Sequence, residues 1–214
     1  MAQVLDADQV PQARRAVIWS DDARLIRRPF LTYGELAAEE DDRPLRTALG
    51  RALLLLLVIG AFVSITSAGR LVAFHVVGTM AFWSFLPLVQ GLVFAGTARL
   101  VAPRFDVKAA LALHSRGYAP WHLFLLAVSG VCLFAPDVAA ALLTLLRSGV
   151  LPGLLALTWA TSGLLTFACF RSGMGLARGR SLAATGLYYL GYVIAIVSYY
   201  LAMNQIQPQL PWAP

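Results

Sequence analysis

Long apolar runs separated by short polar connections fill the chain from Ala52 onward, whereas the first fifty residues are polar. A helix needs about 20 consecutive apolar residues to cross roughly 30 Å of hydrocarbon. Runs of this kind occupy 50–69, 71–98, 118–135, 150–170 and 182–203. The pattern predicts an all-α polytopic membrane protein with five transmembrane helices.

Prolines subdivide the runs. The second run is longer than one crossing needs and contains Pro87, which removes a backbone donor and predicts a kink. Pro152 falls in the first turn of the fourth run, a position typical of a helix start. The mixed connection 99–116 predicts a short surface helix over 107–113. Segment 138–146 is too short to cross alone, and it either extends the third helix past a kink or lies in the interface.

Basic residues between the runs indicate the orientation. Successive connections hold Arg43, Arg46 and Arg51; then Arg70; then Arg99, Arg104, Lys108 and Arg116; then Arg147; then Arg171, Arg178 and Arg180; and the tail holds none. Positive charge collects on the cytosolic side of membrane proteins. We therefore expect a cytosolic N-terminus, an external C-terminus and multi-pass insertion in a bacterial cytoplasmic membrane. The first run would act as an uncleaved anchor, because no short apolar run precedes it.

Three segments follow from this topology: a cytosolic and partly interfacial segment over 1–45, a transmembrane domain over 46–205 and an external tail over 206–214. In the first segment, Pro29 splits a mixture of arginines and apolar side chains into two short pieces. This segment is either a flexible tail or docks on a partner or on the protein's own loops. The acidic run 39–42 is expected in solvent, because an anionic lipid leaflet would repel it.

Composition agrees with a membrane protein and argues against nucleic-acid binding. The chain is 59% hydrophobic and 13% charged, against about 25% charged residues in soluble domains. The net charge of +6 is attributed to arginines that flank the spans, because no dense basic stripe with interleaved aromatics is present. Lipid headgroup contacts are expected for Arg27, Arg28, Arg171, Arg178 and Arg180.

Few polar groups fall within or at the ends of the runs. His75, His122 and Asp137 are expected near the membrane interfaces as solvated groups, and Gln90 is the deepest, where an interhelical hydrogen bond is its expected use. These groups supply too few ligands for a metal site, and no cofactor is expected. Cys132 and Cys169 are expected to be buried thiols.

Aromatic side chains are abundant in the fifth run. Tyrosines stand at positions 188, 189, 192, 199 and 200. Tyrosine and tryptophan collect where the bilayer meets water, so these residues are expected at a membrane interface.

Two short motifs resemble one family. Arg27 to Leu36 reads Arg-Arg-Pro-Phe-Leu-Thr-Tyr-Gly-Glu-Leu, and Gly117, Tyr118 and Pro120 open the third run. Both are similar to segments of bacterial members of the Yip family of Ypt/Rab-interacting membrane proteins. The resemblance implies five spans, a cytosolic N-terminus and a C-terminus across the membrane. It does not extend to Rab binding, because the Asp-Leu-Tyr-Gly-Pro element of eukaryotic members is missing, and it implies no common activity.

Three functions were weighed on these observations. The favoured one is a non-enzymatic accessory subunit or membrane-organising protein that contacts other integral membrane proteins and lipid. The second is a small transporter or channel, in which His75, Gln90 and Asp137 would line a path. An intramembrane enzyme is disfavoured, because the chain has no H-E-x-x-H, no G-x-S-x-G and no paired membrane aspartates.

Overall fold

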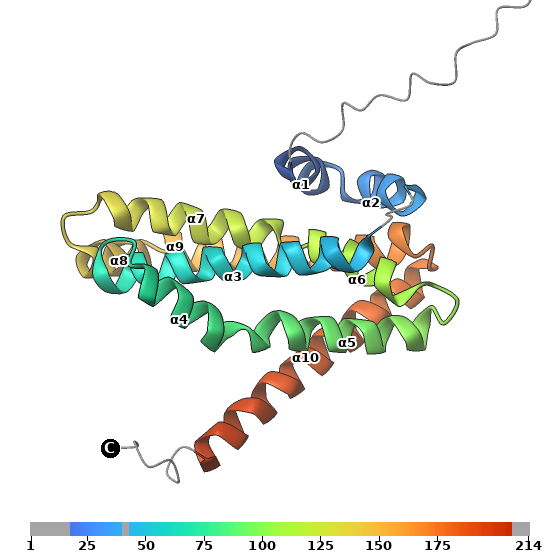
Figure 1. Ribbon diagram of the computed structural model, residues 1–214. Helices are drawn as coiled ribbons and strands as arrows, with labels where there is room; N and C mark the ends of the chain where they lie inside the picture. The colour runs from blue at the N-terminus through green and yellow to red at the C-terminus, as the bar shows by residue number, and fades with distance from the viewer. Residues whose placement is uncertain (1–17, 40–42, 207–214) are drawn as a thin grey trace, which may run out of the picture.

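The computed structural model describes residues 18–39 and 43–206, and within these residues all regular secondary structure is helical (Figure 1). The elements in chain order are α1 (Ile18–Arg27), α2 (Pro29–Ala38), α3 (Pro44–Ala68), α4 (Ala73–Trp83), α5 (Phe85–Val101), α6 (Val107–Arg116), α7 (Ala119–Phe134), α8 (Val138–Arg147), α9 (Val150–Ala168), the π-helical turn η2 (Cys169–Gly173) and α10 (Arg178–Ile206). Most of the acidic run and nearly all of the tail predicted over 206–214 lie outside the described residues.

Five helical stretches among the described residues are long and apolar enough to cross a membrane. They are Pro44–Ala68, Ala73–Val101, Val107–Phe134, Val150–Gly173 and Arg178–Ala202. This is the architecture of a multi-pass membrane protein, as the apolar runs predicted. Each stretch begins or ends a few residues away from the predicted run, chiefly because the helices continue into the flanking polar sequence.

The segment predicted as a surface helix over 107–113 is instead part of the third stretch. Helix α6 carries buried Ala110, Leu113, His114 and Ser115, and it packs between α3 and α5. Asp106 begins it as an N-cap, accepting bonds from the backbone of the first turn. The surface expectation was wrong because the charges of 99–116 suggested solvent, whereas they stand at the ends of a helix whose middle is buried.

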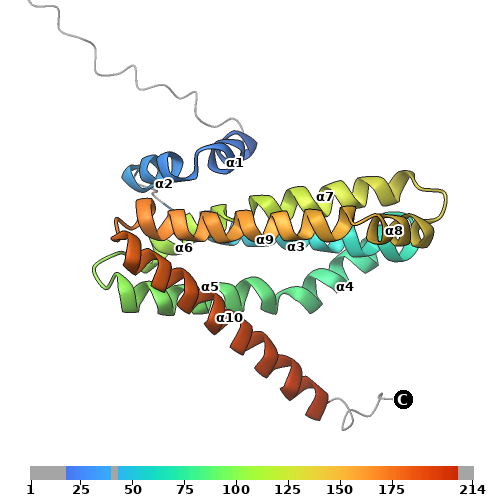
Figure 2. The ribbon, with the colours of Figure 1, turned by 180° about the vertical axis from the view of Figure 1, so that it is seen from behind.

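The helices form a bundle from which one element departs. α3, α6–α7 and α9 lie side by side, α4 packs against α3, and α5 packs against α6 and α10. Both views show α10 leaving the bundle beyond its first turns, so that its second half lies apart from α9 (Figures 1 and 2). There α10 is held to α5, where Phe85 and Tyr199 stack at 4.1 Å between ring centroids. Segment 138–146 is a separate helix, α8, at the end of the bundle far from α2.

The second stretch is broken near its middle, as Pro87 predicted. α4 ends at Trp83 and α5 begins at Phe85. Proline has no N–H to donate to the carbonyl four residues earlier, which here belongs to Trp83, and its ring clashes with that carbonyl. The Ser84 hydroxyl donates to the Ala81 carbonyl at 2.7 Å within the break. The kink separates α4, which packs along α3, from α5, which packs along α10.

The turn between α3 and α4 is tight and internally bonded. Gly69 ends α3 with φ of 66°, a conformation that favours glycine. The Ser64 hydroxyl donates to the Arg70 carbonyl at 2.9 Å and accepts from the Val72 amide at 2.8 Å. One turn earlier, Gly60 lets the two helices approach, because a Cβ built there would lie 2.8 Å from the Val76 carbonyl oxygen. The α3–α4 hairpin is therefore closely packed at this end.

The N-terminal segment docks on the bundle of its own chain over residues 18–38. α1 and α2 meet at the break before Pro29, as the sequence predicted. They lie on the flank of the bundle at the end where α3 begins (Figure 1). Leu25 and Tyr33 are 0% and 1% exposed, and they belong to the main apolar core together with Phe170 of η2. Of the alternatives left open for this segment, docking on its own chain is the one observed.

Both thiols are buried and free, as predicted. Cys169 lies in the main core with Ala168 and Phe170, at the end of the bundle covered by α2. Cys132 lies in a smaller cluster with Ile65 and Val128, on facing turns of α3 and α7. Each thiol fills space as a small apolar group.

Candidate functional site

A buried ion pair fastens α1 to the bundle. Arg51 of α3 donates to an Asp22 carboxylate oxygen at 2.7 Å, and the two side chains are 8% and 6% exposed. A second, less buried pair joins Arg116 to Asp21 at 3.2 Å. The second Asp22 oxygen has no hydrogen-bond partner among the described residues. Burial raises the pKa of Asp22, while the neighbouring Arg51 guanidinium acts in the opposite direction.

Helix α2 contributes a buried tyrosine to the same end of the bundle. Tyr33 packs under the junction of α6 and α7, where a Cβ built on Gly117 would lie 3.4 Å from its hydroxyl oxygen. Burial raises the pKa of this phenol well above its usual range, so the hydroxyl stays protonated in the folded protein. The side chain closes the central cavity on the α2 side.

The central cavity lies between the spans and has a volume of about 310 Å³. Each of the five candidate spans contributes to its wall. Most lining side chains are aromatic or aliphatic, with a few polar groups among them: Tyr33, Leu55, Ile59, Phe62, Val63, Trp83, Leu86, Gln90, His114, Gly117, Tyr118, Trp121, Leu125, Trp159, Ser162, Thr166, Tyr188, Tyr189 and Tyr192. No lining residue carries a formal charge at neutral pH, which makes the cavity suited to an uncharged occupant.

A polar and aromatic cluster forms one wall of the cavity. The His114 ring stacks on Phe94 at 4.0 Å between centroids, and its Nε2 lies 3.3 Å from the Tyr188 hydroxyl. Thr166 donates to the Ser162 carbonyl at 2.9 Å, which satisfies its own hydroxyl. The Ser162 hydroxyl and the Gln90 side-chain oxygen are buried with no partner among the described residues. The wall therefore offers two free polar groups.

His114 was not predicted as a cavity residue. The charges around it indicated a surface connection, whereas the side chain is 6% exposed. A usable signal was present, since Ala110, His114, Tyr118, Trp121 and Leu125 recur at helical spacing into the third run. That stripe marks one continuous inward face across both α6 and α7.

The predicted polar candidates have different environments. Gln90 lines the central cavity, but His75 stands exposed on α4 and Asp137 is exposed, and neither lines it. Asp137 caps α8 by accepting from the Ala140 amide at 3.0 Å. His122 was expected to be solvated, and this was wrong, since it is 0% exposed and both ring nitrogens lack partners among the described residues. The expectation failed because the side chain faces the inside of the bundle.

The tyrosines of the last helix also differ from expectation. Tyr188, Tyr189 and Tyr192 line the central cavity, whereas the sequence suggested a membrane interface. Tyr192 follows Tyr189 by three residues and Tyr188 by four, so the three side chains share one face of the helix. That face meets α5 and α9. Tyr200 is 50% exposed, and Tyr199 stacks on α5. The aromatic-belt rule does not distinguish an interfacial ring from one that faces a neighbouring helix.

The family-like residues lie at the α6–α7 junction. Gly117 has no room for a side chain, because a Cβ would lie 3.0 Å from the His114 carbonyl oxygen. Tyr118 is buried, and Pro120 stands in the first turn of α7, where its missing N–H is not needed. These residues turn the chain between two helices that together form the third span.

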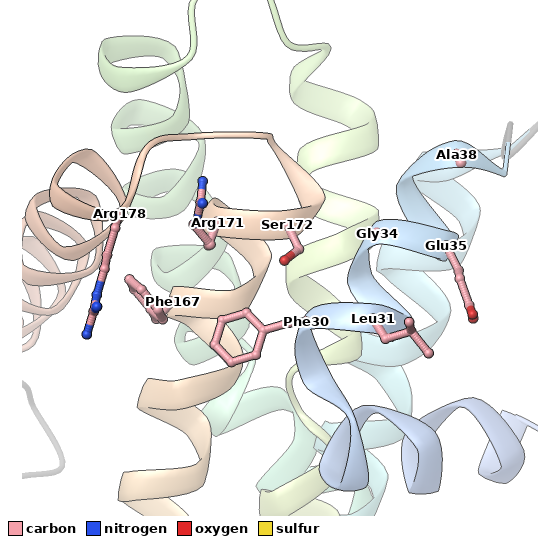
Figure 3. Close-up of a pocket in the computed structure, with 9 residues that line it drawn as sticks. All are labelled: Phe30, Leu31, Gly34, Glu35, Ala38, Phe167, Arg171, Ser172 and Arg178. Atoms are coloured by element: carbon pink, nitrogen blue, oxygen red, sulfur yellow. The ribbon is translucent and has the colours of Figure 1, made fainter.

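A second site, the α2–η2 groove, opens on the surface at the α2 end of the bundle (Figure 3). Its volume is about 1000 Å³, and its lining residues are Phe30, Leu31, Gly34, Glu35, Ala38, Phe167, Arg171, Ser172 and Arg178. Phe30 and Phe167 meet edge to face at 5.8 Å in its floor, and Arg171 and Arg178 stand on the η2 side (Figure 3). Glu35 also lines the groove, on the α2 side, and pairs with Arg24. The groove combines an aromatic floor with two guanidinium groups.

The predicted headgroup arginines are not equivalent. Arg171 donates to the Leu176 carbonyl at 2.6 Å, and Arg180 donates to the Val101 carbonyl at 2.7 Å. Arg27 and Arg28 are exposed but do not line the groove. Arg178 is exposed and lines it, so Arg178 is the groove arginine best placed to meet an anion.

The two sites described above provide groups that can bind a ligand. Among the described residues, no three His, Cys, Asp or Glu side chains lie close enough to hold a metal ion. Comparison with known proteins found no matching family model, no similar curated protein and no similar solved structure.

Proposed function

We propose that this chain is a non-enzymatic accessory protein of a bacterial cytoplasmic membrane, of Yip-like type. It would have its N-terminus in the cytosol and its C-terminus outside. It acts by packing on the helices of other integral membrane proteins and by contacting anionic lipid at its cytosolic end. The proposal rests on the resemblance of the two motifs, on the charge alternation along the chain and on the surface of two spans.

The observation that carries the proposal is the unequal burial of the spans. In Pro44–Ala68, Val107–Phe134 and Val150–Gly173, 39–44% of the most apolar window is buried within the chain. The corresponding shares are 6% for Ala73–Val101 and 17% for Arg178–Ala202. Fewer side chains of these two spans are fully buried within the chain, so these spans leave more surface for contacts outside it.

Small residues on these two spans support helix contacts. Gly78 of α4 and Gly186 of α10 are exposed, and a Cβ built on either would meet nothing within 4 Å. Small residues on an outward helix face allow close approach of a second helix in a membrane, where van der Waals packing drives association. The two spans thus offer a face for partner helices.

Site-specific photo-crosslinking in the native membrane tests the proposal. A photoreactive amino acid would replace Val77 on α4 or Leu190 on α10, which are 65% and 59% exposed, and Leu157 on α9 as a control at 63% exposed. We expect adducts with foreign membrane proteins at Val77 or Leu190, identified by mass spectrometry, and far fewer at Leu157. Adducts with lipid alone at both positions, together with a lone protein in a gentle-detergent pull-down, would contradict an accessory role.

A small transporter is the second candidate, and one observation favours it. Gln90 lines a cavity between the spans, as a solute path would require. His75 and Asp137 do not line that cavity, which leaves Gln90 as the testable residue of the three. Solute flux into liposomes that is lost in Gln90→Leu would favour transport over the accessory role, and flux equal to that of empty liposomes would eliminate it.

A further inference from the structure

The central cavity has the dimensions of a small-molecule site. Its 310 Å³ is about twice the roughly 150 Å³ of an engineered apolar cavity that accepts one benzene molecule. Ligand pockets in proteins begin at about 300 Å³. The volume therefore suits one substituted ring or a ring with a short chain, and it is too small for a whole phospholipid.

The walls favour a flat, uncharged molecule. Trp121 and Trp159 meet edge to face at 5.5 Å, and Trp159 lies 6.3 Å from the Tyr189 ring. Aromatic side chains attract other rings through stacked and edge-on contacts. The lining residues carry no formal charge, and an ion in such surroundings would lose its hydration without compensation.

Two unsatisfied polar groups select for oxygen atoms on that molecule. Ser162 is 8% exposed, and its hydroxyl has no partner among the described residues. The buried side-chain oxygen of Gln90 also lacks one. Buried polar groups are almost always paired, and leaving one unpaired is costly. A ligand carbonyl would accept from the Ser162 hydroxyl, and a ligand hydroxyl would donate to the Gln90 oxygen.

The cavity has an opening toward the bilayer. Trp159 lines the cavity and is nevertheless 44% exposed, so its ring forms part of the rim. Beyond its first turns, α10 departs from α9 (Figure 2). A polar contact joins the two helices at Thr166 and Tyr189, whose hydroxyl oxygens lie 3.5 Å apart. A membrane-soluble molecule can therefore reach the cavity between α9 and α10 without passing through water.

We propose that the central cavity binds an uncharged, membrane-soluble ring compound bearing carbonyl or hydroxyl oxygens, the chemistry of a quinone headgroup. The Ser162 hydroxyl donates to a carbonyl of the quinone, the Gln90 oxygen accepts from a hydroxyl of the corresponding quinol, and Trp121, Trp159 and Tyr189 enclose the ring. This binding is independent of the accessory role, since the cavity lies inside the bundle and the partner faces lie outside it.

Tryptophan fluorescence of the full chain in lipid nanodiscs tests the proposal, because Trp83, Trp121 and Trp159 line the cavity. The probe is ubiquinone-1, a quinone with one isoprenoid unit, which quenches indole on contact. We expect quenching that saturates, above the linear quenching due to partition into the nanodisc. Ser162→Phe fills the cavity, and it should weaken the saturable phase at least tenfold. Leu157→Phe, at a lipid-facing position of the same helix, should leave it unchanged.

A gentler variant keeps the test valid if Ser162→Phe does not fold. Ser162→Ala removes only the hydroxyl, and we expect it to weaken binding by about fivefold, the effect of one lost hydrogen bond. Linear quenching alone in the unaltered protein would overturn the proposal. Saturable binding in both Ser162 variants as tight as in the unaltered protein would overturn it too. A saturable change in tryptophan fluorescence on adding oleate, an ionised single chain, with no saturable quenching by the quinone would also overturn it.

Discussion

The buried pair Asp22–Arg51 is expected to hold the N-terminal helices on the bundle, and removing the carboxylate tests this directly. Asp22→Ala leaves the Arg51 guanidinium, now 8% exposed beside apolar groups, without its partner. Breaking a buried pair from one side costs about 3–5 kcal/mol, because the remaining charge stays desolvated. Arginine cannot escape this cost by losing its proton. At about 1.4 kcal/mol per factor of ten, the docked state of α1 should become about 100- to several-thousand-fold less favoured.

The opposite variant should behave differently with pH. In Arg51→Met the unpartnered group is Asp22, which can become neutral by binding a proton. The docked state then binds more protons than the undocked state, so its stability falls as pH rises above the ordinary carboxyl pKa of 3.8. We expect the defect of Arg51→Met to shrink by up to about 1.4 kcal/mol per pH unit between pH 7 and pH 5. The defect of Asp22→Ala should change much less over that range, because its unpartnered group, the Arg51 guanidinium, keeps its charge.

Hydrogen–deuterium exchange of peptides covering 18–38 measures both effects, after correction for the intrinsic pH dependence of exchange. Arg24→Ala is the matched control, because Arg24 and Glu35 form an exposed pair on the same two helices, with side chains 51% and 43% exposed. Such a pair contributes about 0–1 kcal/mol. Unchanged protection in Asp22→Ala, or an equal loss in Arg24→Ala, would refute the assignment of docking to the buried pair.

Three further outcomes follow from the packing and charge described above. Gly60→Ala should lower the melting temperature, because its Cβ would lie 2.8 Å from a backbone oxygen, whereas Gly50→Ala, with open space, should leave it unchanged or raise it. Above pH 10 the Tyr33 phenol ionises only when α2 is undocked, so rising pH should release α2 in the unaltered protein. Tyr33→Phe should abolish this step in a titration followed at 295 nm. Arg178→Gln should reduce retention of phosphatidylglycerol in native mass spectrometry, and Arg147→Gln, at the opposite end of the bundle, should not.

The sequence predicted the features that depend on local rules. Five apolar runs, the kink at Pro87 and the break at Pro29 each follow from hydrophobic length or from proline chemistry, and the structure has all three. Helix bounds were less accurate, because charged residues continue a helix beyond the apolar run. At α6 this error placed a buried helix on the surface.

The candidate sites depended on contacts that no local rule supplies. Arg51 was counted as a flanking charge, but its partner Asp22 stands 29 residues earlier on a separate helix. Tyr188 and Tyr192 could be assigned to an interface or to a cavity only once the path of α10 was known. Gln90 was the exception, since its depth in a run marked it from the sequence alone.

The packing of α2 on η2 also sets an order of assembly. Residues Pro29–Ala38 leave the ribosome early, yet their buried face meets Cys169–Gly173, which are synthesised more than a hundred residues later. The N-terminal helices therefore have no complete docking surface until the fourth span is in place. During biogenesis their apolar side chains must be covered by lipid or by a chaperone, and their final attachment occurs only on a chain whose first four spans have been inserted.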